Sequence, residues 1–347
     1  MEIKKILIKK IKEKKRSLKI DEFISLCLYK KNSYYKSSLP IGIKGDFITS
    51  PEISQMFGEI IGAYILNFWT KHIKSKFNLI ELGPGTGTLI EDIVRVGKLN
   101  KQFIKLANIK LIEKNINLIK LQKQKINSLN IKNTKWLYDF NIRSKLPSII
   151  YSNEFFDCLP VRLFYKSEYW KEKTIDYNLL EKKFFLKDEK VRDKKIMAYL
   201  NKNNQSKIVE ISFERKEYFN KLCKHVYKNK GLIITVDYGY ENTLSNFTLQ
   251  SVSSHKKTHF FDNLGKQDIS SHINFKELIN IGKKNNLKIL LFSSQKDFLI
   301  SHGIIERKNI LTKNLSIDKK KIIENQYNKL IKNDKMGKDF KFLILSS

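Results

Sequence analysis

A glycine-rich loop between an apolar run and a helix-forming stretch is the feature that most constrains the fold of this chain. The apolar run is Phe77–Gly83, the loop reads Gly83-Pro84-Gly85-Thr86-Gly87, and Thr88–Val96 has the pattern of a helix. Glycine lets the backbone approach a ligand closely, and a helix N-terminus presents free N–H groups. A strand, glycine turn and helix in this order begin the βαβ unit of an open α/β sheet, although a purely structural tight turn would give a similar pattern.

The order of the other elements extends this unit into a doubly wound parallel sheet. Alternation of buried strands with helices gives right-handed crossovers and a sheet covered on both faces. Together with Phe77–Gly83, the expected strands number seven: Asn108–Glu113, Thr134–Phe140, Pro147–Asn153, Gly231–Tyr238, Leu287–Ser293 and Phe340–Ser346. Further helices are expected up to Ser128, at Phe213–Tyr227, at Asn274–Lys284 and through Asp334.

Two other parts of the chain depart from this alternation. Apolar residues recur near helical spacing in the first 30 residues, which predicts amphipathic helices there. Aromatic-rich segments at Val161–Tyr169 and Thr174–Leu186 predict antiparallel strands inserted into the sheet-forming core, whereas Gly239–Ser271 reads as irregular. We therefore expect an N-terminal helical segment and lid over residues 1–75, and a core over residues 76–347 with insertions near 160–200 and 240–272.

The charge balance is strongly basic, with 67 Lys+Arg against 35 Asp+Glu and a net charge of +32. Such a charge invites a nucleic-acid partner, because a basic surface releases counterions from a phosphate backbone. Only seven of the 67 residues are Arg, however, and bidentate recognition of phosphate or guanine favours Arg. Lys, Asn and Ile are over-used together and share AT-rich codons, so base composition is the preferred explanation and a nucleic-acid partner is not expected.

The spacing of cysteine and histidine, and the sequence of the N-terminus, limit the types of site and the cellular compartment that we expect. Cys27, Cys158 and Cys223 have no CxxC spacing, and His255 and His259 lack a third ligand, so neither a disulfide framework nor a metal site is expected. No apolar run approaches the ~18 residues that span a bilayer. The N-terminus lacks a secretory h-region and carries acidic residues that a transit peptide would avoid. We expect a cytoplasmic, bacterial protein, with a mitochondrial matrix less favoured.

Carboxylates follow the first strands, where open α/β sheets bind their ligands. Glu81 precedes the glycine loop, and Glu113 closes the next strand, where it could accept two hydrogen bonds from a ribose diol. Ile90 occupies the place of the third glycine of a dinucleotide fingerprint, so a nucleoside with an amino-acid or sulfonium tail fits better than a pyrophosphate. Asp139 with Phe140 could contact and cover an adenine, or could equally be a surface Asp beside a core Phe.

Two further motifs contain candidate site residues. Asn153-Glu154-Phe155-Phe156-Asp157 follows the fourth strand, and its carboxylates and aromatic rings could hold a cationic nitrogen nucleophile. The alternative is that both Phe side chains belong to the core and Glu154 caps a helix. Gly45–Glu52 is a polar loop that leads into a helix with Ser50 as N-cap and Pro51 as first residue. The density of polar groups in this loop also suggests a lid.

Several sequence blocks together resemble one family, the MidA-type S-adenosylmethionine-dependent methyltransferases, which is the family of the mitochondrial complex I assembly methyltransferase. In chain order they are GDFITSPEISQMFGE, LIELGPGTGTLIEDI, SNEFFDCLPVRLF, ITVDYGY, TLQSVSSH, GKQDISSHINF, FLISHGI and MGKDFKF. The resemblance runs from about Ile20 to Phe342. Cys158 stands where the family usually has Ala. The resemblance implies a class I methyltransferase fold, which has seven strands, S-adenosylmethionine as cofactor, and protein arginine methylation of a subunit of the NADH dehydrogenase complex.

These observations give a set of candidate site residues. The catalytic candidates are Glu154, with Asp157 second, and Asp46 in the lid. The cofactor-binding candidates are Glu81, Gly83, Gly85, Gly87, Glu113, Asp139, Asn153, Thr49 and Ser50. A flanking carboxylate would draw the charge of a guanidinium away from the attacking nitrogen.

Two alternative functions stay open, together with a possible homodimer. A nucleic-acid amine methyltransferase is suggested by the basic charge and by Asn153 followed by aromatics, although the prolines of the amine-methylase motif are missing. A non-catalytic assembly chaperone that binds S-adenosylmethionine would use the inserted strands Val161–Leu186 as its interaction surface.

Overall fold

The main sheet of the protein has the order β15-β16-β10-β5-β2-β3-β4, with β14 added to the end of β10. The computed structural model describes residues 3–30, 33–37, 42, 45–131, 133–202 and 206–347. Strands β4, β3, β2, β5 and β10 are parallel, and β16 runs antiparallel to both of its neighbours. The bounds are β2 Phe77–Leu82, β3 Ala107–Ile112, β4 Thr134–Leu137, β5 Ser148–Asn153, β10 Gly231–Tyr240, β14 Ile273–Asn274, β15 Lys288–Ser294 and β16 Phe340–Ser346. The predicted doubly wound, seven-stranded sheet is confirmed, with the two-residue β14 as an addition.

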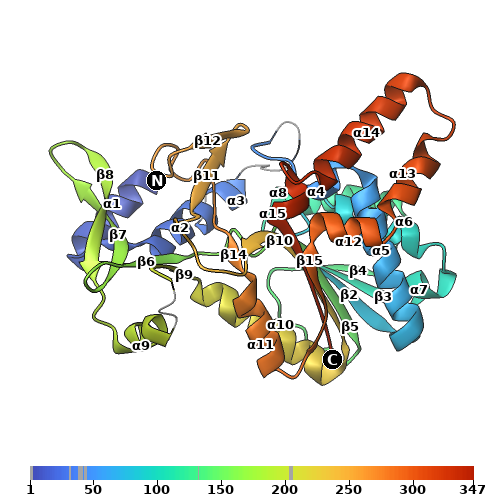
Figure 1. Ribbon diagram of the computed structural model, residues 1–347, viewed down its shortest axis with the longest axis horizontal. Coiled ribbons are helices and arrows are strands. Elements are labelled where there is room, and N and C mark those ends of the chain that lie inside the picture. The colour runs from blue at the N-terminus through green and yellow to red at the C-terminus, as the bar shows by residue number, and fades with distance from the viewer. Residues whose placement is uncertain (1–2, 31–32, 38–41, 43–44, 132, 203–205) are drawn as a thin grey trace.

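Helices cover both faces of this sheet because its strands are apolar on both sides (Figure 1). In β2, Phe77 and Leu79 pack into one core, whereas Ile80 and Leu82 pack into the other. The first core also contains residues of α5 Gln55–Phe68, α6 Thr88–Gly97, α7 Lys101–Leu106, α8 Ile116–Ser128, α12 Gln295–Ser301, α13 Ile304–Thr312 and α14 Ile317–Ile331. The second core contains residues of α10 Phe213–Asn229 and α11 Phe275–Lys284.

A second, antiparallel sheet lies beside the main one, at the left of Figure 1. Its order is β1-β7-β6-β9, and β8 pairs with β7. The bounds are β1 Leu18–Lys19, β6 Arg162–Lys166, β7 Trp170–Asn178, β8 Lys183–Lys190 and β9 Ile208–Ile211. The predicted antiparallel strands, inserted in the chain between β5 and β10, are confirmed, and they form a sheet of their own. Their apolar residues Val161, Leu163 and Ile175 pack against α1 Ile3–Lys14 and α2 Ile20–Tyr29.

The structure corrects two more predictions of secondary structure. The predicted strand Thr174–Leu186 contains the turn between β7 and β8. The stretch Gly239–Ser271, expected to be irregular, holds a three-stranded sheet of β11 Gln250–Ser253, β12 Lys256–Thr258 and β13 Asp268–Ser270. These strands are short and mostly polar, so they show no apolar alternation in the sequence.

The remaining short elements are α3 Tyr34–Ser37, α4 Ser50–Ile53, η1 Trp69–Ile73, α9 Lys194–Lys202 and α15 Met336–Asp339. The division at residues 75 and 76 stays a prediction: α1 and α2 pack on the second sheet, whereas α5 packs in the core of the main sheet. The described part of the chain contains no helix long and apolar enough to cross a membrane.

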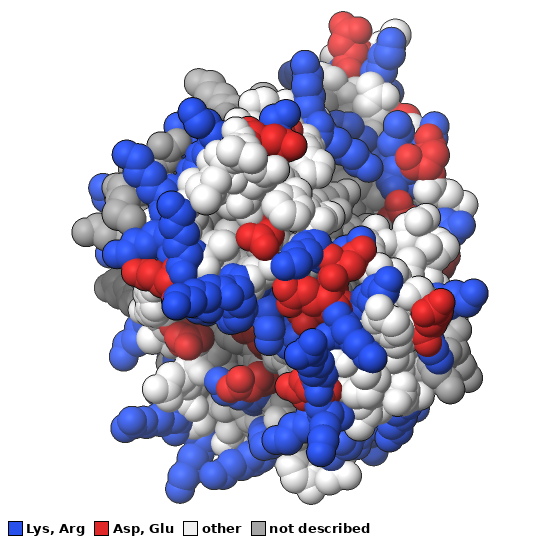
Figure 2. Space-filling model, turned by 90° about the vertical axis from the view of Figure 1, so that its left-hand side faces the viewer, with Lys and Arg blue, Asp and Glu red and all other residues white. Residues whose placement is uncertain are grey.

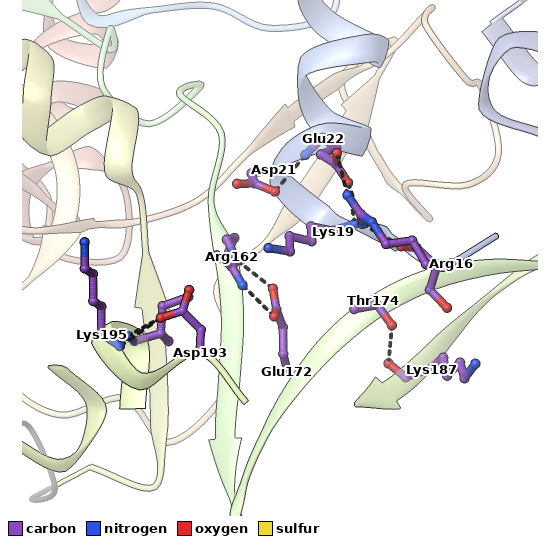
Figure 3. A network of polar contacts seen from close by, with 12 residues as sticks. Arg16, Lys19, Asp21, Glu22, Arg162, Glu172, Thr174, Lys187, Asp193 and Lys195 are labelled. Atoms are coloured by element: carbon purple, nitrogen blue, oxygen red, sulfur yellow. Dashed lines mark hydrogen bonds and ion pairs between the residues drawn. The ribbon is translucent and has the colours of Figure 1, made fainter. Parts of the chain in front are cut away.

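Charged side chains are mixed over the face that the second sheet presents. In Figure 2, lysine and arginine are scattered over this face with acidic side chains among them. Beneath the surface, Arg162 of β6 donates from Nε and Nη2 to the two carboxylate oxygens of Glu172 on β7, at 2.6 Å each (Figure 3). Asp21 and Glu22, in the first turn of α2, lie close to this pair (Figure 3). The buried ion pair therefore joins two strands on which α2 rests.

Candidate active site

A cavity of about 360 Å³ opens at the carboxyl ends of β2, β3 and β5. It receives seven of the predicted site residues: Thr49, Glu81, Gly83, Gly85, Glu113, Asn153 and Glu154. The other five, which are Asp46, Ser50, Gly87, Asp139 and Asp157, do not line it. The cavity lies where open α/β sheets place their ligand sites.

The glycine loop is in the left-handed backbone region at each of its three glycines. The φ angles of Gly83, Gly85 and Gly87 are +60°, +56° and +84°, which L side chains rarely adopt. A Cβ on Gly83 would lie 3.0 Å from Cδ2 of Phe155, and one on Gly87 would lie 3.3 Å from Cγ of Gln122. The loop therefore exposes backbone without a side chain to the cavity at Gly83 and Gly85. Gly87 does not line the cavity and is the N-cap of α6.

Glu113 is held in one orientation at the end of β3. Its Oε1 accepts from the backbone N–H groups of Lys114 and Asn115, both at 2.8 Å, and burial raises the pKa of the carboxyl. Its Oε2 accepts from Nε2 of Gln122 at 3.3 Å. A fixed, buried carboxylate of this kind fits the recognition of a ribose diol.

Gln122 is a site residue that sequence reasoning missed. It is fully buried, donates to the carbonyl of Gly85 at 2.7 Å, and accepts from Nε1 of Trp136 on β4 at 2.9 Å. One side chain thus connects the glycine loop, β4 and Glu113. The available signal was its place between Leu118 and Ile126, one turn from each on the buried face of α8.

Glu81 lies deeper, at 2 % exposure, and accepts from the hydroxyl of Tyr151 at 3.2 Å. Burial raises the pKa of Glu81 to about 8; the charge of Glu113 raises it further and that of Lys125 lowers it. A cation bound in the cavity would favour the ionised form of this carboxyl.

The lid segment is tied to the glycine loop by Glu52 of α4. Its Oε1 accepts from the hydroxyl of Thr88 at 2.6 Å and also from the hydroxyl of Thr86. Thr49 is the N-cap of α4, so the prediction of Ser50 as N-cap is wrong. Ser50 is fully buried as the first helical residue, and its hydroxyl donates to Oε1 of Gln295 at 3.2 Å.

Glu154 follows β5 with a left-handed φ of +52°, which is strained for a residue with a side chain. Its carboxylate accepts from Nδ2 of Asn153 at 2.9 Å and from the backbone N–H of Ser50. Burial, and then the charge of Asp157, raise the pKa of Glu154 to about 8. The Glu154 carboxyl therefore joins α4 of the lid segment to the end of β5.

An acidic cluster lies behind Glu154. Asp157 accepts from the hydroxyl of Tyr238, and Asp237 accepts from the backbone N–H of Phe156 at 3.0 Å. Asp268 of β13 is also buried, and burial raises the pKa of all three carboxyls. Asp237 and Asp268 were not predicted as site residues, because long-range folding, not sequence spacing, brings them to Asp157.

Two predicted site residues have structural contacts away from the cavity. Asp46 accepts from the hydroxyl of Tyr34 at 2.8 Å and from the backbone N–H of Ser254 at 2.6 Å, so it ties the lid to the β11–β12 turn. Asp139 is exposed and accepts from the backbone N–H of Phe140 at 2.8 Å. The roles predicted for these residues stay untested. Within the described residues, no group of three or more His, Cys, Asp or Glu is placed to hold a metal ion.

Two thirds of the chain matches one protein family. A family model of S-adenosyl-L-methionine-dependent methyltransferases matches residues 60–293. The chain belongs to this family. The predicted resemblance to the MidA-type methyltransferases is confirmed, and S-adenosylmethionine is the cofactor of the family.

Individual relatives agree with this membership, and a solved structure shares the fold. The methyltransferase is 29% identical over 341 residues to the mitochondrial protein arginine methyltransferase NDUFAF7 of Danio rerio, with 89% of this chain and 78% of the relative covered. It is 29% identical over 348 residues to NDUFAF7 of Homo sapiens, with 90% and 76% covered. A Burkholderia thailandensis structure bound to S-adenosyl-homocysteine superposes with a TM-score of 0.86 at 19% identity, covering 99% of this chain and 92% of the other.

The residues of the cavity fit S-adenosylmethionine. Oδ1 of Asn153 is buried and has no hydrogen-bond partner among the described residues, so an acceptor is left for a donor such as an ammonium group. Glu113 matches the ribose, and the bare loop of Gly83 and Gly85 allows close approach of the ligand. These residues of the methyltransferase would hold the cofactor.

Proposed function

We propose that the protein transfers a methyl group from S-adenosylmethionine to an arginine side chain of a protein substrate. The observation that carries this proposal is that one cavity is lined both by the glycine loop with Glu113 and by Glu154, whose carboxyl is backed by three buried aspartates. Acidic side chains around the acceptor side suit a guanidinium, because the charge of a bound guanidinium, whose pKa lies above about 12, would favour their ionised forms. The names of the relatives at 28–29% identity support the same activity.

The chemistry requires positioning and the removal of one proton. The cofactor supplies an electrophilic methyl group, and its sulfur keeps the electron pair of the C–S bond when the nitrogen forms the new C–N bond. Holding the acceptor nitrogen in line can contribute ~7–11 kcal/mol of the barrier reduction. Glu154 would hydrogen-bond the guanidinium, localise its positive charge away from the attacking nitrogen, and accept the proton that this nitrogen loses.

The protein partner is proposed from the sequence resemblance to the MidA-type methyltransferases. A subunit of the NADH dehydrogenase complex would be the substrate, because that resemblance implies this target. A flexible segment that carries an arginine fits the cavity better than a folded surface, since the cavity of about 360 Å³ lies at strand ends beneath α4.

The test is to incubate the protein with labelled S-adenosylmethionine and a lysate of its own cells that lack the gene, and then to locate the label by mass spectrometry. We expect labelled arginine in one or a few proteins. Label on lysine, on nucleic acid or on nothing would contradict the proposal.

Variants then separate binding from transfer. Glu154→Gln should bind S-adenosylmethionine like the wild type but lose methyl transfer by about a hundredfold or more, as expected for a lost general base. Glu324→Gln is the matched control, because this half-exposed carboxylate pairs with Lys308 on the surface. If Glu154→Gln transfers methyl groups at the wild-type rate, the role of Glu154 is wrong.

A further inference from the structure

The N-terminal helices supply part of the cavity wall that the family's cofactor motifs do not account for. Ser25 and Tyr29 come from α2, and Tyr35 comes from α3. They line the same cavity as Glu154 and Cys158. These helices rest on the second sheet, so the wall is built by a part of the fold outside the main sheet.

Tyr29 and Tyr35 form a rigid aromatic pair in this wall. Their rings are stacked, with centroids 5.8 Å apart and an interplanar angle of 17°. The hydroxyl of Tyr29 donates to the carbonyl of Cys158 at 2.8 Å, and the hydroxyl of Tyr35 donates to Oδ1 of Asp268 at 2.7 Å. Because both phenol protons are already donated to the protein, the pair can offer a ligand only its aromatic rings and the lone pairs of the phenol oxygens, which suits a donor such as a guanidinium.

Acidic side chains surround this pair. Tyr35 is bonded directly to Asp268, and the charges of Asp268 and Asp157 both act on Glu154. Arg215 is a buried cation that donates to the carbonyls of Phe156 and His272 and to the hydroxyl of Ser271. Burial raises the pKa of Asp157 and of Asp237, and the charge of Arg215 acts on both and partly offsets that rise. Four acidic side chains, Glu154, Asp157, Asp237 and Asp268, therefore lie together around this end of the cavity.

We propose that Tyr29 and Tyr35, anchored on Cys158 and Asp268, form a stacking wall that selects the planar guanidinium of arginine over the ammonium of lysine. This inference rests on the proposed function and names its specificity-determining residues. A guanidinium is weakly hydrated and stacks on aromatic faces while its N–H groups bond a carboxylate, which Glu154 provides. An ammonium is a compact, strongly hydrated charge and gains less from a stacked ring. Asp268 acts through Tyr35 and is a positioning residue.

The test measures binding of two small probes to the full chain saturated with S-adenosyl-homocysteine. The probes are Nα-acetyl-arginine amide and Nα-acetyl-lysine amide, and calorimetry gives their affinities. We expect the arginine probe to bind about tenfold or more tightly than the lysine probe, and Tyr35→Leu to remove about tenfold of the arginine affinity. Tyr35→Phe keeps the ring but loses the hydrogen bond to Asp268, so its preference for arginine should be smaller than that of the wild type and larger than that of Tyr35→Leu. Asp268→Leu, which removes the same anchor and keeps the ring, should lower the preference to a similar extent.

Control variants distinguish loss of the stacking wall from loss of the folded structure. Tyr227→Leu replaces a half-exposed tyrosine of α10 that does not line the cavity, and should leave both probes unaffected. Affinity for S-adenosyl-homocysteine should stay within about twofold of the wild type in each variant that folds. If Tyr35→Leu does not bind S-adenosyl-homocysteine, Tyr29→Leu replaces it.

The outcomes distinguish this inference from the proposed function. Equal binding of the two probes, or unchanged arginine affinity in Tyr35→Leu or Tyr29→Leu, overturns the stacking wall even if the wild type methylates arginine. Arginine binding that depends on the tyrosines supports the wall, and if the wild type then places its methyl group on another residue, only the proposed function fails.

Discussion

Gly83 is the residue at which β2 turns into the loop. Its φ of +60°, and the 3.0 Å that would separate an added Cβ from the Phe155 ring, make Gly83→Ala a direct test of the cofactor site. The left-handed backbone costs an L-residue ~1–2 kcal/mol, and the methyl group must displace Phe155, which also lines the cavity. We expect affinity for S-adenosylmethionine to fall about tenfold or more, measured by calorimetry.

Gly303→Ala is the matched control for this prediction. Gly303 also has a positive φ, +96°, but it caps α13 away from the cavity, and the nearest atom to an added Cβ is 3.6 Å away. This variant should lose stability and keep its affinity for the cofactor. Equal loss of affinity in both variants would show that general destabilisation, and not the shape of the loop, is responsible.

Glu81 makes stability depend on pH. Its pKa is raised from 4.5 to about 8 in the folded protein, so its contribution is fully present below pH 4.5 and is lost as pH rises through 8. Without cofactor, Glu81→Gln should therefore lose less stability than the wild type between pH 4.5 and 8. The difference in slope is at most ~1.4 kcal/mol per pH unit, measured by urea unfolding. Parallel curves for wild type and Glu81→Gln would refute the buried, neutral state of this carboxyl.

Most of the predicted residues that line the cavity lie at the ends of strands or just after them. Glu81, Glu113 and Glu154 were found because the end of an apolar run is visible in the sequence, and parallel strands end at one edge of a sheet. Asp237 and Asp268 were missed because their proximity to Asp157 depends on how β10 and β13 pack, which no local pattern encodes.

Among the strands, those made mainly of apolar residues were predicted best from the sequence. Strands such as β2 and β16 are mainly apolar and were placed almost to the residue. The short polar strands β11 to β13 have no such run. The strands of the second sheet were predicted from their aromatic-rich segments, but the pairing of β7 with β1 was not, because it joins residues more than 150 positions apart.

The ion pair of β6 and β7 gives a prediction about the second sheet. Arg162→Met would leave Glu172 buried without its bidentate partner, and should lower the free energy of unfolding by ~3–5 kcal/mol in urea titrations. Lys173→Met, which removes a partly exposed pair with Asp188 on the same sheet, should cost less than ~1 kcal/mol. The double variant Arg162→Met/Glu172→Met should recover most of the loss. If it is as unstable as Arg162→Met alone, an unpaired buried carboxylate is not the cause.

For the whole molecule, the net charge of +32 is separate from the chemistry of the site. The ionisable side chains named at the acceptor side of the cavity are acidic, whereas lysine and arginine on the face shown in Figure 2 are dispersed among acidic side chains. A dispersed positive charge attracts polyanions weakly and without sequence preference, and the binding falls steeply with salt.

We therefore expect binding of duplex DNA with a Kd of ~10⁻⁴–10⁻⁶ M at physiological salt, with further loss as salt rises. Methyl transfer to the protein substrate should be unchanged after nuclease treatment of the lysate, because no nucleic acid would take part in the reaction. The measurement is labelled transfer at several salt concentrations, with and without nuclease, beside DNA binding by fluorescence anisotropy. Transfer that disappears with nuclease, or that parallels DNA binding as salt rises, would make nucleic acid the substrate and the basic surface part of its recognition.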